Sequence, residues 1–402
     1  MSPIDELHRD LTMRPAAAGH YTPESPVTRL QRPRSRIIPR PTWVLSSAFV
    51  LGCLSFGILP SVLAQPAPRV DPANREHLHA LLEQGKSLAA EGRLAEAEMP
   101  LLEAAQLAPD DFQTLTILAE VQARIGKSAQ AIELFRKVVG LYPRVADSHL
   151  NLGIALADAG QLEEALKETS KAVALASRMT SAHVNRARVL DDLRRLSEAE
   201  SEFAVAYKLD PKNPDCLFYW ALVERESGNL KKEAELLQEL VVVQPDNYKA
   251  AYALGQSLQE QSRDEEAIKA LRQAVAIKPD YQEALYLLSR ELRKSAPEES
   301  RQLDEQFQAV RQRQSTLDSS ESLGNEAFAA AGRKDLPEAI RLLRKALDIC
   351  GQCEASAGLH KNLGLALCRN GNVSEGRTEL EISLKLNPND PDVVKALNVI
   401  GR

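Results

Sequence analysis

Residues 146–179 read ADSHLNLGIALADAGQLEEALKETSKAVALASRM. Gly153 in this stretch belongs to a column of small residues that recurs every 34 positions. The members of this column are Gly85, Ala119, Gly153, Ala187, Ala221, Gly255 and Ser289. A second column with the same period contains Pro109, Pro143, Pro211, Pro245 and Pro279, with Ser177 in its vacant position. Two columns with one period predict a stack of helical repeats rather than a single globular core.

Each repeat predicts two antiparallel helices joined by a tight turn. Within residues 146–179, Gly160 is typical of the residue that ends a first helix. Ala165 then marks the apolar face of a second helix, and the proline that follows most repeats prevents its continuation. Two helices approach closely only where one presents a small side chain. We therefore expect Gly153 and Ala165 to lie where the two backbones nearly touch.

These features resemble the tetratricopeptide repeat family, whose 34-residue signature contains an apolar position, Leu, Gly, Tyr, Ala, Phe and Pro. The resemblance implies an all-α fold, namely a right-handed superhelical solenoid of antiparallel helix pairs with about nine repeats. Seven regular units within residues 76–316 cover 78–111, 112–145, 146–179, 180–213, 214–247, 248–281 and 282 to about 316. Two further units within 317–390 surround Gly324 and Gly364, and residues 391–402 are expected to form a capping helix.

Three places depart from the regular pattern. Glu233 stands where the fifth unit needs its second small residue, which predicts a rotated or loosened helix. The run Ser315–Ser320 predicts a joint between the seven regular units and the last two. Gly376 holds the second small position of the ninth unit, where glycine is tolerable but favours a helix less than alanine does.

The N-terminal region predicts export. Residues 1–64 carry seven Arg, no Lys and four acidic residues, and an apolar run over 43–59 precedes a proline and a small-residue motif ending at Ala64. This order predicts a signal peptide cleaved after Ala64, followed by a proline-rich spacer over 65–75. The alternatives are an uncleaved signal anchor and, in third place, a lipoprotein modified at Cys53. The expected location is periplasmic or secreted, or anchored to the membrane with the repeats outside the cytoplasm.

Charge excludes one class of partner. The whole chain has a net charge of −6, and residues 1–64 account for +3, so the remainder carries −9. An acidic body without a basic stripe argues against nucleic acid as the main partner. Protein or peptide segments are the expected partners, with membrane contact only through the N-terminal segment.

A column on the first helices is the best candidate for a binding surface. Its members are again 34 residues apart: Leu82, Thr116, Leu150, Val184, Phe218, Tyr252 and Tyr286. In the family that the chain resembles, the first helices line a concave groove and this column usually faces it. Aromatic side chains there suit an extended peptide or an apolar helix. The alternative, equally weighted, is that these side chains fill space between neighbouring first helices.

Polar residues accompany the column. Arg225, Arg290 and Arg293 would supply positive charge beside it. Asn151 and Asn185 occupy a position that holds a peptide backbone in some members of the family, although ordinary surface amides are the favoured interpretation.

The histidines and cysteines, which could bind a metal or react, lie in patterns that do not indicate catalysis. His149, His183 and His360 share a position that faces the partner helix, which favours packing over metal binding. Cys350 and Cys353 lie at the end of a second helix and predict a local structural disulfide in an oxidising compartment. Cys216 and Cys368 are expected to be buried small residues. No phosphate loop, nucleophile motif or cofactor site is recognisable, so we expect no enzymatic activity and no cofactor.

Together these patterns predict an exported protein–protein interaction scaffold that binds partner segments in a concave groove, with a role in cell-envelope assembly. The alternative is a non-catalytic recruiting subunit for a separately encoded enzyme, for example one that modifies glycans or proteins.

Overall fold

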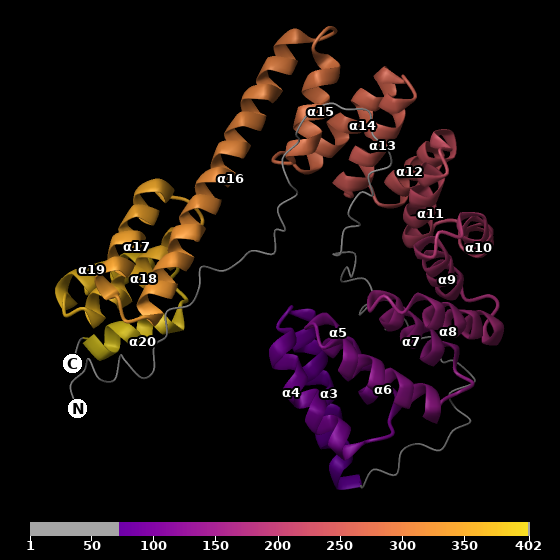
Figure 1. The fold of residues 1–402 in the computed structure, drawn as a ribbon, viewed down its shortest axis with the longest axis horizontal. Helices are drawn as coiled ribbons and strands as arrows, with labels where there is room; N and C mark the ends of the chain where they lie inside the picture. The colour runs from indigo at the N-terminus through magenta and orange to yellow at the C-terminus, as the bar shows by residue number, and fades with distance from the viewer. Residues whose placement is uncertain (1–71, 401–402) are drawn as a thin grey trace. The chain divides into compact units, whose positions relative to one another are not determined.

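The computed structural model describes residues 72–400 (Figure 1). These residues form 18 helices and no strand. None of the described helices is long and apolar enough to cross a membrane. The predictions for the export signal, Cys53 and nearly all of the spacer concern residues 1–71, which lie outside the described part.

The helices divide between two compact units, residues 72–277 and 278–400. The first unit contains α3 (Pro72–Ala90), α4 (Leu94–Leu107), α5 (Phe112–Arg124), α6 (Ser128–Leu141), α7 (Ala146–Asp158), α8 (Leu162–Leu175), α9 (Thr180–Asp192), α10 (Leu196–Leu209), α11 (Pro214–Glu226), α12 (Leu230–Val243), α13 (Tyr248–Glu260) and α14 (Asp264–Ile277). The second contains α15 (Gln282–Leu292), α16 (Pro297–Gly332), α17 (Leu336–Cys350), α18 (Ser356–Arg369), α19 (Val373–Leu386) and α20 (Pro391–Ile400).

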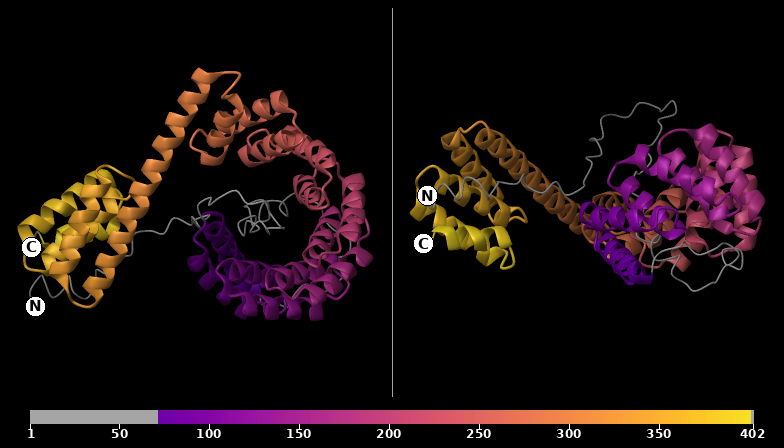
Figure 2. Two further views of the ribbon diagram at one scale, coloured as in Figure 1. Left: turned by 45° about the horizontal axis from the view of Figure 1, so that its top comes forward. Right: turned by 90° about the horizontal axis from the view of Figure 1, so that it is seen from below.

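In residues 72–277 the helices pair in chain order, which confirms the predicted architecture. From α5 to α14 every first helix has 13 residues and every second helix has 14. The pairs follow one another along a curve (Figure 2). In Figure 1, α7, α9, α11 and α13 lie on its inner side, and α8, α10, α12 and α14 lie on its outer side.

Local sequence sets the ends of these helices. Asp111, Asn213 and Asn247 cap first helices by accepting a hydrogen bond from a backbone N–H three residues later. In the turn after each first helix, one residue adopts a left-handed conformation, which closes the turn tightly. Glycine holds that position in four pairs, whereas Arg194 (φ 62°) and Ser262 (φ 57°) hold it in the fourth and sixth. Those two turns carry a backbone strain that the glycine turns avoid.

The small-residue column lies between the two helices of each pair, as predicted. A Cβ atom added to Gly153 would lie 2.6 Å from Thr169 Cγ2 and 3.4 Å from the Ala165 carbonyl oxygen. Ala119 and Ala187, the equivalent residues of the neighbouring pairs, are fully buried. The core is shared between repeats, because Phe135, Leu156 and Val189 from three successive repeats belong to one apolar cluster. Each repeat is therefore stabilised by its neighbours.

The expectation of a loosened fifth repeat is wrong. The helix α12 keeps the usual 14 residues, and Glu233 is only 3% exposed at the small-residue position. Its carboxylate accepts hydrogen bonds from Arg225 Nη1 at 2.8 Å and from Ser257 Oγ at 2.9 Å. Because both partners come from first helices, the carboxylate cross-links α11, α12 and α13 instead of separating them.

The expected joint at Ser315–Ser320 is also wrong, since α16 runs without interruption through 36 residues. Arg313 stands where the period would place a proline, so nothing ends the helix there. The hydroxyls of Ser319 and Ser320 donate to the carbonyl oxygens of Ser315 and Thr316, which keeps these serines inside a helix. The helix α16 thus packs on α15 with its first part and on α17 with its last part. The proposed limit at 316/317 falls inside it.

The helices α18 and α19 pack closely against each other. A Cβ atom on Gly376 would lie 2.7 Å from the Gly364 carbonyl oxygen and 2.9 Å from the Cys368 backbone nitrogen. The two backbones are therefore in direct contact, and Gly376 is required there rather than tolerated.

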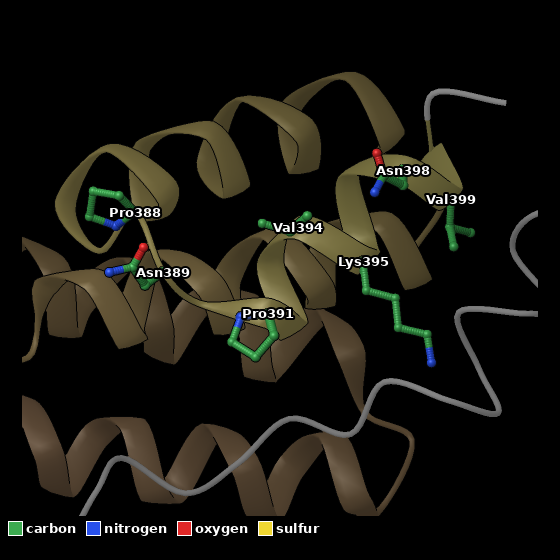
Figure 3. A pocket seen from close by; sticks show the side chains of 7 residues that line it. All are labelled: Pro388, Asn389, Pro391, Val394, Lys395, Asn398 and Val399. Atoms are coloured by element: carbon green, nitrogen blue, oxygen red, sulfur yellow. The ribbon is translucent and has the colours of Figure 1, made fainter.

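The predicted capping helix is α20. Val393, Ala396 and Val399 bury one face of it against α19, whereas Val394 is 42% exposed. Val394 and Pro388 border an open depression at this end of the repeats (Figure 3).

Candidate protein-binding face

The candidate column does not form one uniform surface. Leu150 and Val184 are 2% and 3% exposed, and each belongs to an apolar core cluster. Phe218 and Tyr252 are half-buried, whereas Tyr286 is 52% exposed. Leu150 and Val184 are thus core residues, and the prediction that they contact a partner is wrong because neighbouring helices cover them.

The three aromatic members have different surroundings. The Phe218 ring packs edge-on against Tyr219 at 5.3 Å between centroids, and the Tyr252 hydroxyl accepts a hydrogen bond from Gln256 Nε2 at 2.9 Å. Tyr286 belongs to the unit of residues 278–400, where its ring lies 5.8 Å from that of Phe307. Within residues 72–277, the half-buried aromatic members of the column are therefore Phe218 and Tyr252.

The two predicted asparagines also differ in exposure. Asn185 is buried, its amide donates to the Ser181 carbonyl oxygen, and its side-chain oxygen accepts from Arg188 Nη1, both at 2.8 Å. Both ends of this side chain are used within α9, so Asn185 orients Arg188 rather than holding a peptide. Asn151 is half-buried on α7.

The predicted arginines also differ. Arg225 is half-buried and bonded to both Glu233 and Glu260, so its main role is to tie three helices together. Arg290 and Arg293 are exposed on α15 and just after it, and Arg290 pairs with the adjacent Glu291.

Arg188 is a functional candidate that the sequence analysis missed. Its guanidinium lies 4.4 Å from the centre of the Tyr219 ring on the next first helix, within cation–π distance. Its only sequence signal is the 34-residue interval that links it to Glu120, Ile154 and Leu222.

Four carboxyl groups on the inner helices were missed as well. Burial raises the pKa of Glu120 to about 7, against the charge of Arg124 one turn later. Burial also raises the pKa of Asp147, Asp158 and Asp215, and Arg188 opposes the rise at the last two. Asp158 and Asp215 reach solvent, yet the surrounding helices exclude much of the water near them.

On the outer helices, the carboxylates of Glu198 and Glu266 are paired with arginines. Arg195 and Arg263 each donate two hydrogen bonds to the glutamate three residues later. These hydrogen bonds lower the pKa of Glu198 and Glu266. Among the described residues, none of the four inner carboxyl groups has such an ion pair.

The histidines pack inside repeats, as expected. His149 Nδ1 lies 2.6 Å from Glu168 Oε2, and its Nε2 lies 3.0 Å from the Pro143 carbonyl oxygen. His183 repeats both contacts with Glu202 and Ser177, and His360 repeats the first with Glu379. The sequence signal for the glutamates is their constant interval of 19 residues from each histidine. The described residues contain no cluster suited to a metal ion.

The cysteines follow the sequence pattern. A disulfide joins Cys350 and Cys353, with 5.1 Å between their Cα atoms, and ties the last turn of α17 to the loop before α18. Cys216 and Cys368 are buried thiols, and burial raises their pKa to about 12 and about 11. Neither thiol is suited to nucleophilic chemistry.

A protein-family model matches part of the repeat region. Residues 118–179, 184–246 and 218–282 match the model of the tetratricopeptide repeat family. No curated protein sequence matches the chain.

Several solved structures are similar. A thermophilic tetratricopeptide repeat protein of Thermus thermophilus is 22% identical, with a TM-score of 0.42 over 45% of this chain and 99% of its own. PilF of Pseudomonas aeruginosa is 17% identical, with a TM-score of 0.46 over 54% of this chain and 99% of its own. YrrB, a tetratricopeptide repeat protein with an unusual peptide-binding site, is 18% identical, with a TM-score of 0.37 over 47% of this chain and 98% of its own. The family match shows tetratricopeptide repeats within residues 118–179 and 184–282, and proteins of this family are generally non-catalytic scaffolds that bind proteins and peptides.

Proposed function

We propose that this chain is an exported scaffold that binds segments of partner proteins on the inner face of its first helices and acts in cell-envelope assembly. The observation that carries the binding role is the accessible apolar surface on those helices. Phe218 and Tyr252 are half-buried and Leu222 is 37% exposed, although each lies on the inner layer of a regular stack. Partly exposed aromatic and aliphatic side chains on a rigid frame suit a protein partner.

The export part of the proposal has separate support. The basic and apolar segments within residues 1–64 have the order of a signal peptide. The disulfide between Cys350 and Cys353 is compatible with an oxidising compartment. Mass spectrometry of the exported protein should give Gln65 as its first residue, and an intact N-terminus would favour the anchored form.

Partner capture tests the binding role. Phe218→Ala and Tyr252→Ala should each weaken capture of partners from an envelope extract while far-UV circular dichroism stays close to that of the wild type. Val242→Ala on the outer layer, where Val242 is 72% exposed, is the matched control and should leave capture unchanged. A large loss of helicity in the aromatic variants would show that these rings are core, and an equal loss of capture in the control would refute binding at the inner face. Recovery of assembly proteins favours the scaffold, whereas recovery of a single enzyme favours a recruiting subunit.

A further inference from the structure

The inner face of α5, α7 and α11 combines apolar and acidic side chains in one register. On α7, Asp147, Ile154 and Asp158 follow one another at intervals of seven and four residues, which places them on one side of the helix. On α11, Asp215 and Leu222 flank Phe218 at three and four residues. The same face of α5 presents Glu120. We call these residues the acidic inner face.

Positive charge does not balance these carboxylates. Glu120, Asp147, Asp158 and Asp215 contribute four negative charges when ionised, and Arg124 and Arg188 contribute two positive charges. Arg188 hydrogen-bonds Asn185 and lies against the ring of Tyr219, and its single positive charge acts on both Asp158 and Asp215. Within residues 72–400, none of these four carboxyl groups has an ion pair like those of Glu198 and Glu266, so this face carries an excess of two negative charges when all four are ionised.

The spacing of the helices limits the form of the ligand. The helix α9 packs against both α7 and α11, so the three first helices are successive neighbours. Packed helices lie roughly 8–10 Å apart, and an extended chain advances about 3.3 Å per residue. An extended segment crossing this face therefore passes about three residues per helix.

Resting on the proposed function, we infer that the acidic inner face recognises an extended basic protein segment, in which apolar residues separate the lysines or arginines. The cations pair with the carboxylates of α5, α7 and α11, and the apolar residues contact Ile154, Phe218 and Leu222. Charge complementarity of this kind selects partners and accelerates association. It disfavours acidic segments and nucleic acid by repulsion.

Fluorescence anisotropy with the full chain tests this specificity. The probe is a labelled peptide of four Lys-Leu-Ala repeats, and two matched peptides carry Glu or Gln in place of Lys. We expect the Lys peptide to bind at least tenfold more tightly than either, corresponding to about 1.4 kcal/mol, with weaker binding at high salt. Equal binding of the Gln or Glu peptide would overturn the basic specificity, as would the absence of any peptide binding. Partner capture that depends on Tyr252 would leave the proposed function standing in either case.

Substitutions then locate the site. Asp158→Asn combined with Asp215→Asn should weaken the Lys peptide about tenfold. Asp264→Asn combined with Glu265→Gln removes the same charge from the exposed start of α14 and should change binding less than about twofold. Asp158→Lys combined with Asp215→Lys should bind the Glu peptide more tightly than the wild type does, a gain that misfolding cannot produce. Equal losses in the first two variants, or no gain in the third, would refute the site.

Discussion

Gly376→Ala is the most informative test of the packing. An added methyl group at this position would lie 2.4 Å from Cys368 Sγ, 2.7 Å from the Gly364 carbonyl oxygen and 2.9 Å from the Cys368 backbone nitrogen. Two of these three atoms belong to backbone, so α18 and α19 must move apart. Overpacking of this kind costs about 1–3 kcal/mol, and alanine returns about 1 kcal/mol of helix propensity. With backbone on one side, the upper half of that range applies, and we expect a net loss of about 1–2 kcal/mol.

Hydrogen exchange followed by mass spectrometry gives a local measure of this loss. A change of about 1.4 kcal/mol is tenfold in a local opening equilibrium, so amides of α18 and α19 should exchange roughly 5- to 30-fold faster. Gly358→Ala is the matched control, because the same methyl group on α18 meets no atom within 4 Å. That variant should exchange no faster than the wild type. If Gly376→Ala behaves like the control, the two backbones are not in contact and the reasoning fails.

Three further predictions concern turns, buried pairs and pH. Arg194→Gly and Ser262→Gly should each increase the free energy of unfolding by about 1 kcal/mol and so raise the urea midpoint, whereas Gly160→Ala should lower the midpoint. A lower midpoint in either glycine variant would refute the strain in these turns. Glu168→Gln should destabilise its repeat by about 2 kcal/mol by weakening the contact with His149, and Glu163→Gln on the exposed side of α8 is the control that should have no effect. The folded pKa of Glu120, about 7, lies above its ordinary value of 4.5, so the folded chain retains a proton that the unfolded chain releases. Its contribution to stability therefore falls as pH rises from 4.5 to about 7, and Glu120→Gln should flatten that part of the stability profile.

The repeat architecture could be predicted from sequence because its determinants are local. Small residues between paired helices and prolines after them recur with one period, so Gly153 and Pro143 suffice to place a helix pair. The length of α16 could not be predicted in this way. It depends on Arg313, which stands where the period would place a proline, and on hydrogen bonds of Ser319 and Ser320 that offset the low helix propensity of serine.

The candidate face was predictable only in part. The position of Phe218 follows from the period, but its exposure does not, because the same position is buried at Leu150 and Val184. Exposure there depends on how closely neighbouring first helices pack, which is a tertiary property. The contact between Arg188 and the Tyr219 ring is likewise tertiary, because the two residues lie on different helices.

Site-specific photo-crosslinking tests the central claim most directly. A benzophenone amino acid replaces Leu222 on the inner layer or Val242 on the outer layer, where both native side chains reach solvent. If partners bind the inner face, irradiation should join a partner polypeptide to the chain at position 222, and the Val242 variant should give little or no such product. Crosslinking at position 242 with none at 222 would contradict the account.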